Sequence, residues 1–132
     1  MFLDTSGLLC YLDGAQSGHD ESARLMLSAR RMLTHSYVLA ELVALAHVRG
    51  LPRPTILEFL AELEGDLGIK VVYVDEELHH AAVDVLSHRL DKTYSLCDAV
   101  SFILMERRGL REALTTDHHF EQAGFVQLLS RS

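Results

Sequence analysis

Apolar residues follow two different periods along the chain. Apolar or β-branched runs too short for helices predict strands at residues 1–3, 70–74, 113–116 and 125–129. Apolar residues at helical spacing predict helices at residues 5–12, 20–33, 37–48, 55–67, 75–90, 96–108 and 118–123. Residues 34–36 form a short link or a further strand. Strands that alternate with helices indicate an α/β fold of three layers, with a mainly parallel central sheet of four or five strands and helices on both faces.

The segment at residues 37–48 is apolar on nearly every side, which is typical of a helix deep in a protein. Ser36 precedes it and is a suitable N-cap. Its only acid is Glu41, and burying an ionised carboxylate costs several kcal/mol unless a cation or hydrogen-bond donors compensate it. Glu41 is therefore a candidate ligand for a cation, unless it faces a wet edge of the helix.

Three aspartates also stand beside apolar segments. Asp4 and Asp117 follow the strands at residues 1–3 and 113–116, and ligands of open α/β sheets gather at the carboxyl ends of strands. Asp98 lies in the first turn of the apolar helix at residues 96–108, which Ser95 can cap. Simpler explanations exist for two of them, since Asp4 can act as an N-cap and Asp98 can interact favourably with the helix dipole.

A fourth aspartate, Asp75, is favoured as a plain N-cap, because Glu76 and Glu77 follow it in the first helical turn. If Asp4, Glu41, Asp98 and Asp117 converge, their mutual repulsion raises their pKa values until a hard divalent cation binds. A ligand set made only of oxygen favours Mg²⁺ or Mn²⁺. These acids are scattered over most of the chain, so their spacing alone does not establish that they meet.

The totals describe one domain over residues 1–132, with 48% hydrophobic and 23% charged residues. No apolar run is long enough for a membrane span and no basic leader precedes the first strand, so we expect a cytoplasmic protein. Cys10 and Cys97 are expected to be free thiols. The net charge of −7 argues mildly against RNA binding, although bound cations and the basic residues at 107, 108 and 111 can offset it locally.

Four segments resemble the motifs of a known family. Residues 2–6 (FLDTS), 36–42 (SYVLAEL), 94–102 (YSLCDAVSF) and 114–125 (LTTDHHFEQAGF) resemble the four motifs of the PIN-domain ribonucleases, most closely the VapC toxins of bacterial toxin–antitoxin pairs. The resemblance spans essentially the whole chain. Cys97 departs from the family, which often has Thr or another small polar residue before the acid, and this change is expected to affect rate rather than class.

The resemblance implies a PIN-like fold and an endoribonuclease that depends on Mg²⁺ or Mn²⁺. It implies that the metal and catalytic residues are Asp4, Glu41, Asp98 and Asp117. Ser6 and Ser95 are candidate supporting residues, and His118 or His119 is a candidate contact to the RNA substrate. It also implies homodimerisation and a cognate antitoxin, whose C-terminal segment lies in a groove and inserts an Arg or Lys into the acidic site. The two helices between residues 36 and 67 offer an apolar surface for it.

Two other classes of protein remain open at this point. A non-catalytic binding module with a PIN fold would use the same acids only to receive a basic side chain. A phosphate-accepting signalling domain also places acids around Mg²⁺ at strand ends, but it needs a Lys at a later strand end, and Lys70 and Lys92 fit that role poorly.

Overall fold

The computed structural model describes residues 1–130 and contains a five-stranded sheet in the order β3-β2-β1-β4-β5. All neighbouring strands are parallel, with Phe2 paired to Leu33 on one side and to Ala113 on the other. The strands are β1 (Phe2–Leu3), β2 (Met32–His35), β3 (Ile69–Val72), β4 (Glu112–Leu114) and β5 (Val126–Gln127). The predicted parallel α/β fold is therefore confirmed.

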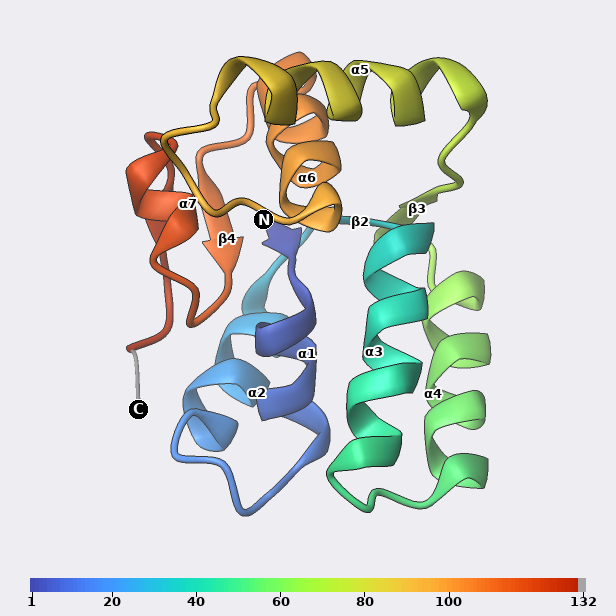
Figure 1. Ribbon diagram of the computed structural model, residues 1–132. Helices are drawn as coiled ribbons and strands as arrows, with labels where there is room; N and C mark the ends of the chain where they lie inside the picture. The colour runs from blue at the N-terminus through green and yellow to red at the C-terminus, as the bar shows by residue number, and fades with distance from the viewer. Residues whose placement is uncertain (131–132) are drawn as a thin grey trace.

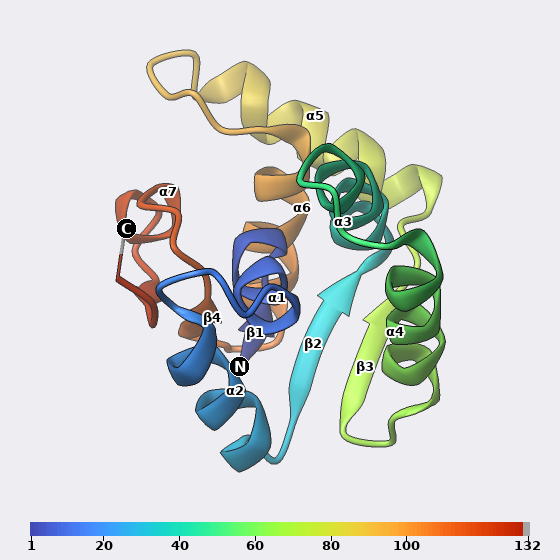
Figure 2. The same cartoon turned by 90° about the horizontal axis from the view of Figure 1, so that it is seen from below.

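Helices cover both sides of this sheet. They are α1 (Thr5–Leu12), α2 (His19–Ser28), α3 (Ser36–Val48), α4 (Arg53–Gly65), α5 (Glu76–His88), α6 (Leu96–Arg107) and α7 (His119–Gln122). Figure 1 shows α1 to α4 below the strands and α5 and α6 above them. Figure 2, turned by 90°, shows β2 and β3 side by side, with α4 next to β3 at one edge of the sheet and α7 at the other edge, beyond β4. The chain thus forms the three layers that the sequence predicts.

The prediction of a helix over residues 20–33 is wrong at its C-terminal end. Helix α2 stops at Ser28, and residues Met32–His35 form β2, which pairs with both β1 and β3. All four residues of β2 are buried, since a strand near the middle of a parallel sheet is covered on both faces. A short apolar run of this kind looks the same in a buried strand and in a helix, which explains the error.

Two expectations for α3 also need correction. Its N-cap is His35 and not Ser36, because the backbone N–H of Val38 donates to His35 Nδ1. The helix is also less deeply buried than expected, since Ala40, Ala44 and Val48 are exposed. Its apolar composition therefore leaves a hydrophobic face at the surface.

A close approach fixes α1 against the sheet. A Cβ added to Gly7 would lie 2.0 Å from the backbone carbonyl oxygen of Leu114, so only glycine allows α1 to pack this near to β4. Ser22 of α2 donates a hydrogen bond to the carbonyl oxygen of Gly7 and lies fully buried behind it. These contacts place the start of α1, and therefore Asp4, beside the end of β4.

A buried hydrogen-bond chain joins β2 to α6. Because His35 Nδ1 accepts from Val38, the proton of its ring lies on Nε2, which donates to Ser101 Oγ at 2.8 Å. Ser101 in turn donates to the carbonyl oxygen of Cys97. Burial lowers the pKa of His35 to about 3, so this ring is neutral in the folded protein.

Within residues 1–130, none of the helices combines the length and the apolar composition that crossing a membrane would require.

Candidate metal centre

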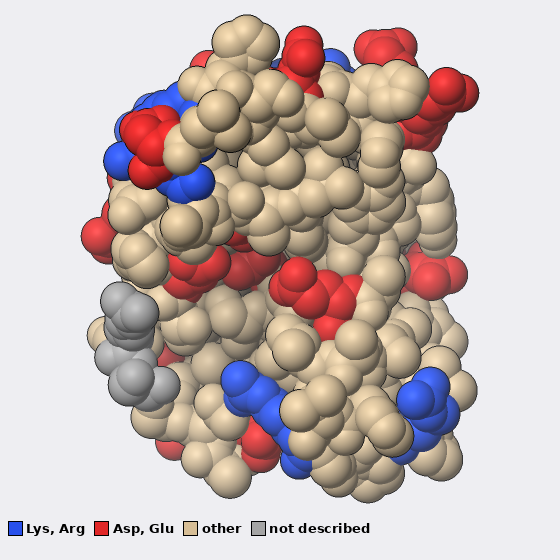
Figure 3. Space-filling view, in the orientation of Figure 1, with Lys and Arg blue, Asp and Glu red and all other residues tan. Residues whose placement is uncertain are grey.

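The candidate site lies beside β1, the strand from which the chain winds first toward one edge of the sheet and then toward the other. Strand β1 has β2 on one side and β4 on the other, so the carboxyl ends of β1 and β4 flank a topological switch point, the usual place for ligands in such sheets. Asp4 follows β1, and Asp117 follows β4 after two threonines. A cavity of about 370 Å³ at this edge is lined by all four predicted acids, Asp4, Glu41, Asp98 and Asp117. Figure 3 shows Asp and Glu atoms gathered across the middle of this face.

Asp4 is almost fully buried, and two hydroxyl groups hold it. Thr115 Oγ1 donates to Asp4 Oδ2 at 2.8 Å, and Ser6 Oγ lies 3.2 Å from the same oxygen. Both contacts use Oδ2, which leaves Oδ1 for a cation. The pKa of Asp4 is raised to about 7, chiefly by burial and also by the nearby Asp98 and Asp117, against the lowering effect of the hydrogen bond from Thr115. The carboxylate form is therefore costly without a positive charge beside it.

Asp98 is held by the start of its own helix. Ser95 and Asp98 form a capping box, in which the N–H of Asp98 donates to Ser95 Oγ and the N–H of Ser95 donates to Asp98 Oδ2. Ser95 is therefore the N-cap that the sequence predicts. Burial raises the pKa of Asp98, and the neighbouring Asp117 adds to this effect. The cap accounts for one oxygen of Asp98 and leaves Oδ1 available.

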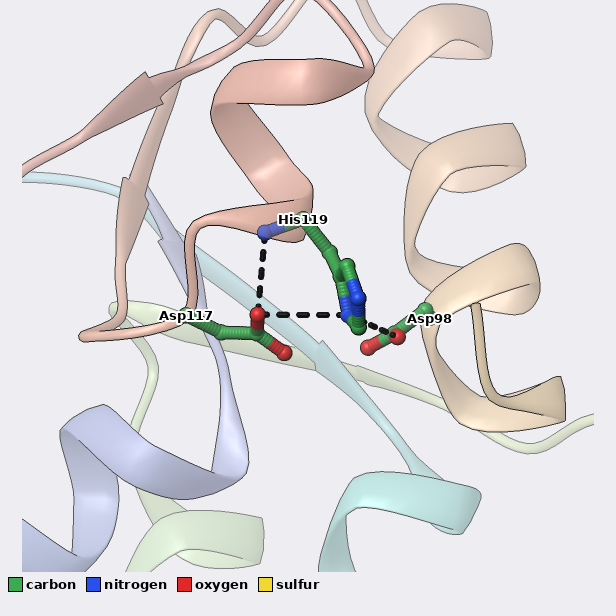
Figure 4. A group of neighbouring side chains, drawn as sticks. All are labelled: Asp98, Asp117 and His119. Carbon is green, nitrogen blue, oxygen red and sulfur yellow. Dashed lines mark hydrogen bonds and ion pairs between the residues drawn. The ribbon is translucent and has the colours of Figure 1, made fainter. Parts of the chain in front are cut away.

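Asp117 and His119 complete the cluster, which Figure 4 shows with Asp98. The backbone N–H of His119 donates to Asp117 Oδ1 at 2.9 Å. His119 Nδ1 lies 3.2 Å from Asp117 Oδ1 and 3.3 Å from Asp98 Oδ2, while its Nε2 lies 2.9 Å from Thr93 Oγ1. Asp98, Asp117 and His119 have potential ligand atoms that all lie within 4.8 Å of one another.

This donor set fits a divalent cation. Each of the three aspartates has one oxygen fixed by the protein, so its carboxylate is already oriented. The buried Nδ1 of His119 has no aligned hydrogen-bond partner among residues 1–130, although two carboxylate oxygens lie beside it. A cluster of carboxylates with an unsatisfied nitrogen is an arrangement that a metal ion can complete.

The other predicted residues lie around this cluster. Glu41 is half-buried on the cavity wall, on the side of α3. Both Glu41 and Asp4 line the cavity but stand outside the tight group of Asp98, Asp117 and His119. Ser6 accepts a hydrogen bond from the N–H of Thr116 as well as contacting Asp4. The side chain of His118 is 43% exposed, whereas that of His119 is only 16% exposed. The roles of these residues in binding and catalysis remain predictions.

The sequence does not predict the positions of two residues of the site, Thr115 and His119. Thr115 reaches Asp4 and also accepts from the N–H of Asp117 at 3.0 Å, and His119 lies between two carboxylates. The signal for Thr115 was weak, because a Thr at the end of a strand is ordinary. The pair of adjacent histidines was visible, but only the backbone of α7 determines which one turns inward.

Asp75 is a useful contrast, because it also follows a strand. Its Oδ1 accepts a hydrogen bond from the N–H of Leu78 at 2.8 Å, so it caps α5 as the sequence predicts. It lies at the end of β3, which is two strands away from β1, and does not line the cavity. Position at a strand end is thus not sufficient for membership of the site.

Comparisons with known proteins identify the family of the chain. The PIN-domain family matches residues 1–126 of the chain. Mycobacterium tuberculosis VapC20, named as a 23S rRNA-specific endonuclease, is 28% identical over 129 residues and covers 97% of both chains. The ribonuclease VapC26 of the same organism is 32% identical over 122 residues, which cover 91% of this chain and 89% of that one. The crystal structure of VapC20, described as a toxin that cleaves the sarcin–ricin loop, superposes with a TM-score of 0.85 over 96% of each chain. The resemblance seen in the four motifs is confirmed: the chain belongs to the PIN-domain family and is a homologue of the VapC ribonucleases.

Proposed function

We propose that the protein is a metal-dependent endoribonuclease and acts as the toxin of a toxin–antitoxin pair. The observation that carries the proposal is the convergence of Asp4, Asp98 and Asp117, each with one fixed oxygen, on one cavity at the switch point of the sheet. The names of the homologous ribonucleases support RNA as the substrate. Ribosomal RNA that contains the sarcin–ricin loop is the first substrate to test, because the VapC20 homologue is described by that activity.

The proposed metal is Mg²⁺ or Mn²⁺, held by Asp4, Asp98 and Asp117. When bound, such an ion supplies an activated water for attack on phosphorus and neutralises charge on the phosphoryl oxygens. Thr115 and Ser6 orient the carboxylate of Asp4, and Ser95 orients that of Asp98. Glu41, which also lines the cavity, is proposed to orient water or to bind the ion. His118 is kept as a candidate contact to RNA, because it is exposed beside Asp117.

The test is cleavage of an RNA panel that includes a sarcin–ricin loop fragment, with Mg²⁺, with Mn²⁺ or with a chelator. The proposal expects cleavage that the chelator abolishes and that falls by a factor of at least about 10² in Asp4→Asn and Asp98→Asn, because a lost metal ligand removes a large part of the electrostatic stabilisation. Circular dichroism checks that the variants are folded. Folded variants that cut as fast as the parent would contradict it.

The two alternative functions lack a supporting observation. In a phosphate-accepting domain a Lys would stand beside the acids, but Lys70 lines a different cavity, with Met1, Met32 and Arg108, and Lys92 does not line the acidic cavity. A non-catalytic module would use the acids only as a receptor for a basic side chain. Loss of metal-dependent cleavage in Asp98→Asn separates that module from an enzyme.

We propose further that the chain forms a homodimer and binds an antitoxin. The support is the exposed apolar side chains of α3 and α4, which include Val48 at 79% exposed and Leu57 at 51% exposed, since exposed apolar surface favours association. A basic residue of the antitoxin would enter the acidic cavity. Light scattering of the purified chain, alone and after co-expression with the adjacent reading frame, tests both. A monomer that forms no complex would contradict this part of the proposal.

A further inference from the structure

Helix α3 presents a line of three different side chains to the acidic cavity. Glu41 and Leu45 belong to α3, and Arg49 is its C-cap residue, so the three recur every four residues and lie on one face. All three line the cavity. The wall thus runs from an acid through an apolar side chain to a base.

Arg49 is the only Lys or Arg that lines this cavity within residues 1–130. Its guanidinium forms no ion pair in the part of the chain that the structure describes, whereas Arg24 and Arg89 each pair with a nearby acid. Figure 3 shows Lys and Arg atoms on the same face as the acidic band, on its lower side. An unpaired cation at the edge of a strongly acidic cavity is suited to bind an anion that extends out of that cavity.

The length of α3 sets how far this anion lies from Glu41, which the proposed function places at the attacking water or the ion. Eight residues of α-helix span about 12 Å between Glu41 and Arg49. A stacked nucleic-acid strand advances about 3.4 Å per nucleotide, so this distance corresponds to about three or four nucleotides. Between the two ends, Leu45 is 38% exposed and offers apolar surface to a sugar or base.

We propose that Arg49 binds a phosphate of the RNA strand about three nucleotides from the bond that is cut. This inference rests on the proposed function. It adds the path of the RNA, along α3 from Glu41 to Arg49, and a minimum length of substrate. Arg49 adds binding free energy only for an RNA that is long enough to reach it. Its removal therefore raises KM for long substrates, leaves kcat nearly unchanged, and has no effect on substrates too short to reach it.

A purely structural role for Arg49 is the main competing explanation, because a cation at the C-terminus of a helix interacts favourably with the helix dipole. Arg49→Gln removes the charge, and Arg49→Lys retains it. Arg53→Gln is the matched control, since Arg53 is also exposed, begins α4 four residues later and does not line the acidic cavity. Thermal unfolding measures the structural contribution of each.

The experiment measures cleavage of RNA oligonucleotides that extend by one to eight nucleotides on either side of the cut. We expect Arg49→Gln to raise KM by a factor of about 10 on long RNA. It should also lower the slope of log affinity against log salt by about 0.7. The variant and the parent should behave alike when the extension on one side falls below about three nucleotides. Arg53→Gln should match the parent throughout.

Two results would overturn the inference while leaving the proposed function standing. In the first, the parent cuts RNA and Arg49→Gln cuts every length equally well. In the second, the variant loses the same factor on the shortest RNA, which would place Arg49 at the cut itself or give it a structural role. Binding of uncut RNA with Ca²⁺ in place of Mg²⁺ separates the two claims. Weaker binding by Arg49→Gln supports the contact even without cleavage, and a parent that neither binds nor cuts RNA overturns both.

Discussion

Thr115 donates a hydrogen bond of 2.8 Å to Asp4 Oδ2, although 111 positions separate the two residues in the chain. Strands β1 and β4 are neighbours in the sheet, so the contact joins the first and the fourth strand at their carboxyl ends. The same hydroxyl oxygen accepts from the N–H of Asp117. One threonine therefore orients two of the three aspartates proposed to hold the cation.

Replacement of Thr115 by Val is expected to weaken the binding of a divalent cation by a factor of about 10, since loss of a group that orients a metal ligand has effects of this size. The variant should also lose about 1–3 kcal/mol of stability, because the N–H of Asp117 loses its acceptor. Calorimetric titration with Mn²⁺ measures the affinity. Thr34→Val is the control, because Thr34 is equally buried and its hydroxyl donates to the carbonyl oxygen of Leu3, away from the aspartates. Equal affinity in the two variants would argue against this role.

The metal-free protein should lose stability as the pH rises toward neutrality, because of Asp4. Its pKa is about 7 in the folded state and 3.8 in an unfolded chain, so between these values the folded state holds a proton that the unfolded chain has released. Stability therefore falls with rising pH across that window, by up to about 1.4 kcal/mol per pH unit. Asp4→Asn has no such proton, so its stability relative to the parent should increase from pH 4 to pH 7.

Denaturant unfolding in a chelator at several pH values measures this difference. Addition of Mn²⁺ should restore stability to the parent at pH 8 more than at pH 5, because the cation binds the ionised form. A difference between Asp4→Asn and the parent that stays constant from pH 4 to pH 8 would show that burial does not raise the pKa of Asp4.

His35 should lower the stability of the protein as the pH falls, whereas Asp4 lowers it as the pH rises. Its pKa is about 3 in the folded state and 6.5 in an unfolded chain, so the unfolded chain gains a proton that the folded state excludes as the pH falls below 6.5. His35→Asn keeps an oxygen to cap α3 but does not reach Ser101, and should cost about 2–3 kcal/mol at pH 7. That cost should shrink as the pH falls toward 4, as measured by denaturant unfolding. An unchanged cost would contradict a neutral, buried His35.

Gly7 should tolerate no side chain. The added Cβ in Gly7→Ala would overlap the carbonyl oxygen of Leu114, so α1 must move away from β4, at a cost of about 3 kcal/mol or more. A Cβ added to Gly14 has no atom within 4 Å, so Gly14→Ala is a matched control with little effect. Thermal unfolding compares the two variants, and we expect a large loss of stability for Gly7→Ala only.

The sequence predicts the layers of this fold better than it predicts one of the central strands. Residues 1–3, 70–74 and 113–116 are bounded by helix starts and polar links, and the structure places β1, β3 and β4 there. Met32 and Leu33 of β2 are predicted as the end of a helix, and Thr34 and His35 as part of a short link or a further strand, because a short segment that is buried on both faces shows no alternation. Only pairing with β1 and β3 makes this segment a strand.

The acids of the site could be found because each interrupts an apolar pattern. Asp4, Asp98 and Asp117 do line one cavity, as does Glu41, which lies on its wall rather than deep in a buried helix. His119 and Thr115 interrupt no pattern, since both are ordinary residues at their positions. Their place in the cluster depends on how the turn after β4 folds back toward α6, which no spacing in the sequence reveals.

Direct binding of Mn²⁺ is the measurement that tests the central claim most closely. Electron paramagnetic resonance measures free Mn²⁺ as the ion is titrated into the parent, Asp98→Asn and Asp75→Asn. Asn can keep the helix cap in both variants, and of these two aspartates only Asp98 lines the cavity. We predict that the parent binds Mn²⁺, that Asp98→Asn weakens binding by a factor of at least about 10, and that Asp75→Asn does not. Equal binding by all three proteins would contradict it.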